Sequence, residues 1–154
     1  MKKSLFFLFA IIPILAFSQS VKLSSIFDVD INHIALVDVV KGPSGYYGAK
    51  NGFKFLTIEG TFHSKAVRRT NMALYKMFVE NDTNTCMALA NPSYTPYSKL
   101  DRFIRFKKKA DKTIYFEVDA NFIEGSLVFN ENTIGIIRVI DDKGNAEIKL
   151  CSRD

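Results

Sequence analysis

The sequence predicts an all-β fold, an antiparallel β-sandwich with an immunoglobulin-like arrangement of strands. Apolar and polar residues alternate with a period of two through most of the chain, as they do in half-buried strands. Polar or glycine-containing turns separate these segments at the spacing typical of a sandwich. No internal repeat and no linker divides the chain, so a single domain is expected. A small β-barrel is an alternative.

The first expected strand is the apolar run His33–Val40, which ends at the turn-rich segment Lys41–Gly52. The next strand is Phe53–His63. Its residues Leu56, Ile58 and Phe62 share one face, and the other face carries Thr57, Glu59, Thr61 and His63. Gly60 lies on the apolar face. A glycine at such a position indicates a β-bulge or the close approach of a neighbouring strand.

The middle of the chain fits two interpretations. Segments Asn71–Glu80 and Thr85–Ala90 flank a polar turn and are expected to form a hairpin. The apolar residues of segment 65–78 also fit one face of a helix, which leaves an α+β fold with one helix as an alternative. We favour strand from Asn71 onward.

The C-terminal half shows four clear strands. Thr113–Asp119 alternates strictly between apolar and polar residues, and Gly125–Asn130 continues the pattern. Ile134–Ile140 and Ala146–Cys151 are joined by the turn Asp141–Asn145, which predicts a hairpin.

Three segments resemble a known family: His33–Val40 with the glycine-rich gap after it, Asn51–Lys65, and Lys107–Phe129. Their order is similar to that in the telokin-like, immunoglobulin-fold extracellular domains of exported bacterial proteins of unknown function. The resemblance covers about residues 33–140. It departs from the family pattern where a Pro-Gly turn would precede the Phe-Glu-Val strand. It implies a binding or accessory module without shared catalytic residues.

The N-terminus has the features of a secretory signal peptide. Lys2 and Lys3 precede the apolar run Leu5–Phe17, which is shorter than the roughly 20 residues that a helix needs to span a bilayer. Ala16 and Ser18 supply the small residues of a cleavage site. We therefore expect a secreted or periplasmic protein without a transmembrane anchor.

Cleavage near Ser18/Gln19 divides the chain into a signal peptide (1–18), an N-terminal segment (19–32) and one β-sandwich domain (33–154). Loss of two lysines lowers the formal net charge from +5 to +3. Cys86 and Cys151 form an even pair, which predicts a disulfide in an exported protein.

Residues for catalysis are harder to find. His33 and His63 belong to no close-spaced motif that would supply the three or four ligands of a zinc site. The sequence contains no Gly-x-Ser-x-Gly elbow and no phosphate-binding loop. We expect no metal, no cofactor and no catalytic residue. A hydrolase with scattered carboxylates is one alternative, because the sequence does not show which carboxylates converge.

A basic cluster is the first candidate binding feature. It contains Arg102, Arg105, Lys107, Lys108 and Lys109. Such a cluster attracts an anionic partner, for example lipopolysaccharide, an acidic glycan or an acidic protein surface. The plainer interpretation is that these charges give solubility beside an edge strand. An exported protein is not expected to bind nucleic acid.

Tyrosines on loops are the second candidate feature, namely Tyr46, Tyr47, Tyr94 and Tyr97. Loop tyrosines supply contact area at low entropic cost, although they also pack loops against a sandwich end. The leading hypothesis is an exported, non-catalytic binding or accessory domain that recognises a protein or an anionic glycan or envelope surface. Another alternative is a small envelope inhibitor that blocks a hydrolase through one rigid, disulfide-stabilised loop.

Overall fold

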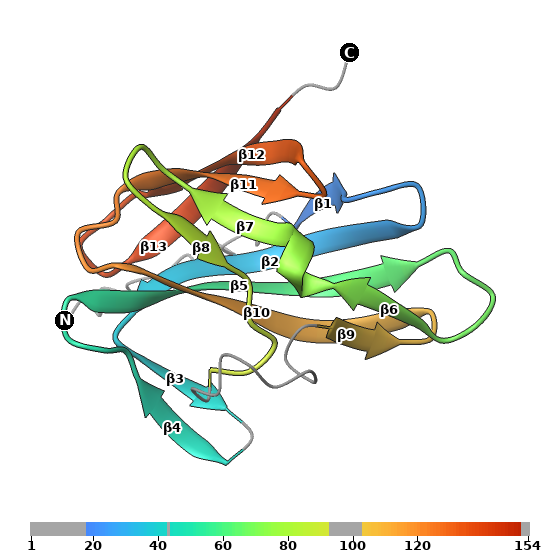
Figure 1. Cartoon of the computed structure of the whole chain (residues 1–154), viewed down its shortest axis with the longest axis horizontal. Helices are drawn as coiled ribbons and strands as arrows, with labels where there is room; N and C mark the ends of the chain where they lie inside the picture. The colour runs from blue at the N-terminus through green and yellow to red at the C-terminus, as the bar shows by residue number, and fades with distance from the viewer. Residues whose placement is uncertain (1–17, 43, 93–102, 152–154) are drawn as a thin grey trace, which may run out of the picture.

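The computed structural model describes residues 18–42, 44–92 and 103–151 (Figure 1). The described chain is all-β, which confirms the predicted class, and its strands pair antiparallel. Helical structure in these ranges is limited to one 3₁₀ turn, Leu74–Lys76. No helix in this part of the chain combines the length and the apolar character that crossing a membrane requires.

The strands follow the alternating segments of the sequence, with short polar turns between most of them. Their bounds are β1 Gln19–Lys22, β2 Phe27–Val37, β3 Val39–Gly42, β4 Gly45–Gly48, β5 Phe53–Ser64, β6 Thr70–Ala73, β7 Met77–Glu80, β8 Thr85–Met87, β9 Phe103–Phe106, β10 Lys109–Asp119, β11 Glu124–Phe129, β12 Asn132–Val139 and β13 Asn145–Leu150.

One large sheet has the strand order β10-β5-β2-β13-β12-β11-β7-β8, with β1 paired to β2. The chain just after β8 returns to β10, because Leu89 and Tyr115 exchange two backbone hydrogen bonds with N–O distances of 2.8 and 3.0 Å. The sheet therefore nearly closes on itself, as the small-barrel alternative describes. Two further sheets have two strands each, the hairpin β3–β4 and the pair β6–β9.

The core lies inside this curved sheet and is built from the apolar faces that the alternation predicts. Phe62 in β5 and Phe116 in β10 are among its most buried side chains. Gly60 lies opposite a register shift in β2, where Asn32 is the additional residue. A Cβ atom at Gly60 would lie 2.8 Å from the backbone oxygen of Asp30. The predicted bulge and close approach at Gly60 are both confirmed.

Three expectations about chain segments have different outcomes. Strand from Asn71 onward is confirmed by β6 and β7, and a 3₁₀ turn between them accounts for part of the helical pattern. The α-helix near residues 65–78 is wrong. The segment 19–32 is not separate from the sheet, since β1 and the start of β2 both belong to it.

The predicted disulfide is not present, because Cys86 and Cys151 are both free. Cys86 lies in β8, whereas Cys151 follows β13. Strands β12, β11 and β7 separate these two positions in the sheet. A disulfide requires the two Cα atoms to be within about 7 Å of each other, so this topology keeps the thiols unpaired.

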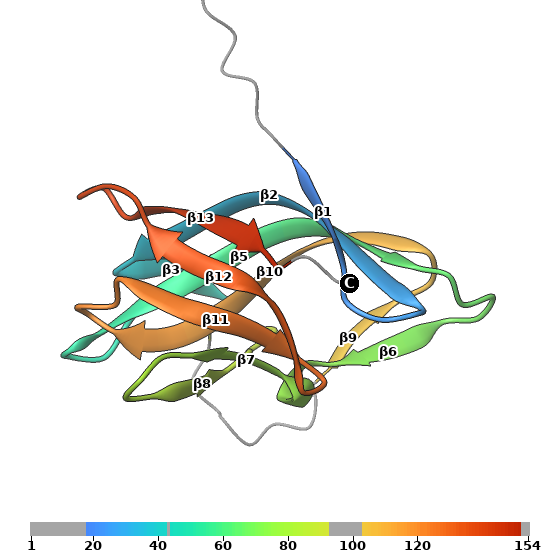
Figure 2. The same cartoon turned by 90° about the horizontal axis from the view of Figure 1, so that it is seen from above.

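The turns gather at two ends of the molecule (Figures 1 and 2). The β1–β2, β5–β6 and β9–β10 turns lie at one end. The β7–β8, β10–β11 and β12–β13 turns lie at the other. Strand β10 runs from the first end to the second, a distance of about 36 Å for a strand of this length.

Candidate functional site

The first end is held together by backbone hydrogen bonds between turns that are distant in sequence. The amide of Ser64 donates to the carbonyl oxygen of Lys108 (2.8 Å), and the amide of Lys65 donates to that of Ile26 (3.0 Å). The pairing of β6 with β9 places Thr70 opposite Phe106. Three turns therefore form a single surface.

This surface is densely basic, and we call it the basic end. Its cationic side chains all belong to exposed residues, which are Lys65, Arg68, Arg69, Arg105, Lys107, Lys108 and Lys109. Sequence reasoning found the members in and after β9 but missed those of the β5–β6 turn. The segment "KAVRR" (65–69) carried the signal, but it lies within the segment 65–78 that also fits a helical pattern.

Most of these cations have no partner among the described residues. Lys65 forms an ion pair with Asp28, with an N–O distance of 3.0 Å. The other members of the basic end form no side-chain hydrogen bond or ion pair of 4.0 Å or less with a described residue. Lys109 contributes only a longer-range electrostatic effect on Asp30. Among the described residues, the basic end thus carries an excess of positive charge.

The nearby carboxylate of Asp30 is already engaged. Its hydrogen bond with Ser20 lowers its pKa below the usual 3.8, and its hydrogen bond with His63 acts in the same direction. The His63 Nε2 atom lies 2.8 Å from the Asp30 Oδ2 atom. Asp30 is therefore ionised at neutral pH but is held by its own neighbours rather than by the arginines.

The tyrosine prediction falls on a different part of the molecule. Tyr46 is 77% exposed on β4, whereas Tyr47 is half-buried against the small cluster formed by Val40, Phe55 and Tyr115. Strands β3 and β4 project away from the basic end (Figure 1). Tyr47 thus packs its hairpin against the sheet, which leaves Tyr46 as the exposed member of this pair.

Three predicted site residues, Tyr94, Tyr97 and Arg102, lie outside the described residues.

A cavity of about 430 Å³ lies between the β3–β4 hairpin and β10, and its lining includes Lys41 and Lys112. The Tyr115 hydroxyl donates to the Lys41 carbonyl oxygen at this cavity, over 3.4 Å. Glu59 and Asp111 also line it, so its charges are mixed rather than basic.

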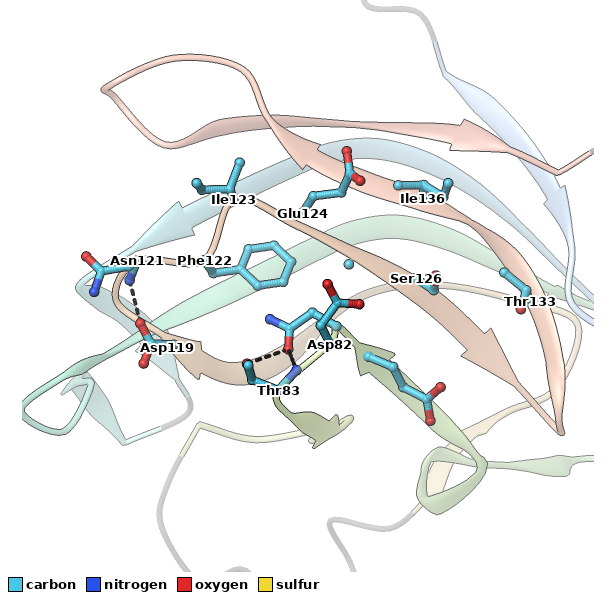
Figure 3. A pocket seen from close by; sticks show the side chains of 13 residues that line it. Asp82, Thr83, Asp119, Asn121, Phe122, Ile123, Glu124, Ser126, Thr133 and Ile136 are labelled. Carbon is cyan, nitrogen blue, oxygen red and sulfur yellow. Dashed lines mark hydrogen bonds between the residues drawn. The ribbon is translucent and has the colours of Figure 1, made fainter.

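The second end of the molecule carries a larger cavity, which we call the acidic groove (Figure 3). It has a volume of about 780 Å³ and lies between the β7–β8 turn and the β10–β11 turn. Four carboxylates line it, from Glu80, Asp82, Asp119 and Glu124. These carboxylates come from two separate parts of the sequence and line one cavity, and sequence reasoning did not identify this set.

Polar side chains of the acidic groove stabilise their own turns. Asn81 Oδ1 accepts from the amides of Thr83 (3.1 Å) and Asn84 (2.8 Å). Asp119 Oδ1 accepts from the amide of Asn121 at 2.8 Å. Such side-chain-to-backbone hydrogen bonds stabilise a turn locally, without contacts from distant parts of the chain.

The fourth carboxylate of the groove, that of Glu124, pairs with a cation from the neighbouring strand. It accepts a hydrogen bond of 2.6 Å from Arg138 Nε. No group of three or more His, Cys, Asp or Glu side chains in the described ranges is placed to hold a metal ion.

The thiol of Cys86 has little nucleophilic character in this setting. Burial raises its pKa, and the Glu117 carboxylate raises it further. Because the thiolate is the nucleophile, a raised pKa keeps this thiol protonated and unreactive.

No protein-family model matches this chain, and no curated protein matches it. A crystal structure of a "putative lipoprotein (ycdA)" from Bacillus subtilis is similar to it with a TM-score of 0.43 and 11% sequence identity. The match covers 85% of this chain and 38% of that protein, so this chain spans less than half the length of its neighbour.

Proposed function

We propose that this chain is an exported, non-catalytic binding domain that recognises an anionic partner through its basic end. Export is supported by the N-terminal sequence, with two lysines, a short apolar run and small residues at the expected cleavage site. Binding is supported by the charge of the surface that three turns form. The domain is the scaffold, and the turns carry recognition, as is common for β-proteins.

The observation that carries this proposal is that the cations of the basic end other than Lys65 have no side-chain partner among the described residues. Arg68 and Arg69 are adjacent in one turn, and the backbone of Lys108 in another turn is hydrogen-bonded to the same loop. Like charges held close together repel, and the chain places no described carboxylate against these arginines. An anionic partner removes this repulsion and is attracted to it over roughly a Debye length, about 10 Å at 0.1 M salt.

One observation favours a second candidate function, a hydrolase. The acidic groove gathers four carboxylates around one cavity, as a catalytic site built from acids requires. Two of these carboxylates are engaged within the protein. Asp119 accepts a hydrogen bond from the amide of Asn121, and Glu124 accepts one from Arg138. The inhibitor hypothesis loses one support, because Cys86 and Cys151 are free and form no disulfide that would rigidify a loop.

The test is retention of the purified protein on immobilised heparin, a generic polyanion, as NaCl is raised from about 0.05 to about 0.5 M. We expect the double variant Arg68→Glu/Arg69→Glu to lower the affinity by about tenfold or more, because electrostatic attraction is lost at the basic end. The matched control is Lys143→Glu/Lys149→Glu, which changes the net charge equally at exposed positions elsewhere. Equal losses in the two variants would refute a localised site.

A further inference from the structure

The basic end also carries exposed apolar side chains. Val67 is 87% exposed and lies in the β5–β6 turn, directly before Arg68 and Arg69. Ile26, in the β1–β2 turn, is 43% exposed. The backbone hydrogen bond from Lys65 to Ile26 joins the two turns. The apolar tips and the cations are therefore parts of one surface.

Single exposed apolar residues are normal on protein surfaces, so exposure alone indicates little. Val67 differs because it is the most exposed of the large hydrophobic residues described, and it lies between Lys65 and the pair Arg68 and Arg69 in the sequence. A partner for this surface must offer both negative charge and an apolar phase. Hydrated acidic glycans offer the charge only.

We infer that the anionic partner is the surface of an anionic phospholipid bilayer, into which Val67 and Ile26 insert while the arginines and lysines contact lipid phosphates. This inference rests on the proposed function and names the partner of the same surface. A bilayer interface places apolar chains just beneath a layer of phosphates, which is the pairing of chemistry that the basic end presents. Long Lys and Arg side chains suit this boundary because their stems are apolar and their heads are charged.

The arrangement of the turns fits a flat partner. The β1–β2, β5–β6 and β9–β10 turns all reach the same end of the molecule in both views (Figures 1 and 2). A planar surface meets all three turns at once. Each Lys or Arg near an anionic bilayer strengthens binding by about fivefold, so several weak contacts add to a measurable affinity.

The first experiment is cosedimentation of the purified protein with vesicles of phosphatidylcholine containing increasing phosphatidylglycerol. We expect binding to rise with the anionic fraction and to fall by about 25-fold or more in Arg68→Glu/Arg69→Glu, because two favourable contacts are lost. The control Lys143→Glu/Lys149→Glu should change binding by less than about fivefold.

The second experiment isolates the apolar contribution. Val67→Ser should lower vesicle binding by about tenfold, the effect of withdrawing one aliphatic side chain from an apolar phase. The same substitution at Val39, which is 54% exposed on the β3–β4 hairpin, should leave vesicle binding unchanged. Neither variant removes a charge, so heparin retention should be unchanged in both.

Because the chain contains no tryptophan, a single introduced Trp reports its own surroundings. The emission of Val67→Trp should shift to shorter wavelength when anionic vesicles are added, whereas that of Val39→Trp should not shift. Absence of a shift at Val67 with intact heparin retention would overturn the bilayer inference and leave the proposed function standing. Loss of specific retention on heparin together with no vesicle binding would overturn both.

Discussion

The basic end and the acidic groove lie at opposite ends of one sheet, yet their charged groups are used differently. At the groove, Asp119 accepts a hydrogen bond from a turn amide and Glu124 accepts one from Arg138. At the basic end, Arg68 and Arg69 have no side-chain partner among the described residues. Carboxylates accept hydrogen bonds from the free amides of turns, whereas Lys and Arg can only donate. A carboxylate can thus stabilise a turn by accepting a hydrogen bond from one of its amides, as Asp119 does. Arg68 and Arg69, unpaired among the described residues, remain available to bind a partner.

The largest expected effect is a loss of overall stability, which affects both ends of the molecule. Phe116, in the strand that connects them, is fully buried, so Phe116→Ala should lower the free energy of unfolding by about 3–5 kcal/mol. Urea denaturation followed by circular dichroism measures this loss. Lys112→Ala, an exposed change in the same strand, should stay within about 0.5 kcal/mol of the parent. A loss below about 1 kcal/mol for Phe116→Ala would contradict its place in the core.

A smaller effect should be confined to the end with the acidic groove. Gly144 has a φ of +83°, and a Cβ atom there would collide with the backbone oxygen of Leu36. Gly144→Ala should therefore lower the free energy of unfolding by about 2–4 kcal/mol, from backbone strain plus overpacking.

Gly52 supplies the matched control for this substitution, since its φ of +84° is nearly the same but its Cβ would meet open space. Gly52→Ala should cost about 1 kcal/mol, the strain alone. Thermal or urea unfolding of both variants separates the two terms. Equal losses would show that the approach of Leu36 contributes nothing.

Removing negative charge from the acidic groove tests whether the groove takes part in binding. The double variant Glu80→Gln/Asp82→Asn should change heparin retention by less than about twofold, because these carboxylates lie at the far end of the sheet and are screened at physiological salt. A large fall in affinity would mean that the groove takes part in recognition. Turnover of a glycan substrate that disappears in this variant would favour the hydrolase instead.

The smallest expected effect concerns acid stability at the basic end. Hydrogen bonds from Ser20 and His63 lower the pKa of Asp30 below 3.8, so Asp30 stabilises the fold when it is ionised. That contribution is full above the unfolded pKa and is lost as the pH falls through the lowered folded pKa. Asp30→Asn should therefore be less stable than the parent at neutral pH, by under about 1 kcal/mol for a partly exposed pair. Unfolding measured from neutral pH down to about pH 2 should show the difference shrinking.

The sequence predicted those parts of the fold that local alternation determines. Side-chain periodicity and nearby turn residues predict strand β5, the role of Gly60 in it, and the hairpin of β12 with β13. The bridge between Leu89 and Tyr115, which brings the sheet close to closure, could not be predicted in this way. Its two partners are distant in the sequence, and no local pattern specifies their pairing.

Four of the seven residues of the basic end were predictable for the same reason. Lys107, Lys108 and Lys109 form a visible run, but Arg68 and Arg69 join them only through the bonding of two distant turns. For the cysteines, by contrast, the sequence predicted a contact that the structure does not contain. An even number of cysteines favours a disulfide when a chain is exported, whereas the order of strands in this sheet keeps Cys86 and Cys151 apart.

Strand β10 begins at Lys109 beside the basic turns and ends at Asp119 in the acidic groove. The exposed cations of the basic end and the carboxylates of the acidic groove thus separate opposite charges along the molecule, and such a separation is an electric dipole. In the field of a negatively charged layer, such a dipole experiences a torque before any contact is made. If the partner is the anionic bilayer proposed above, this torque turns the basic end toward the bilayer before the first contact.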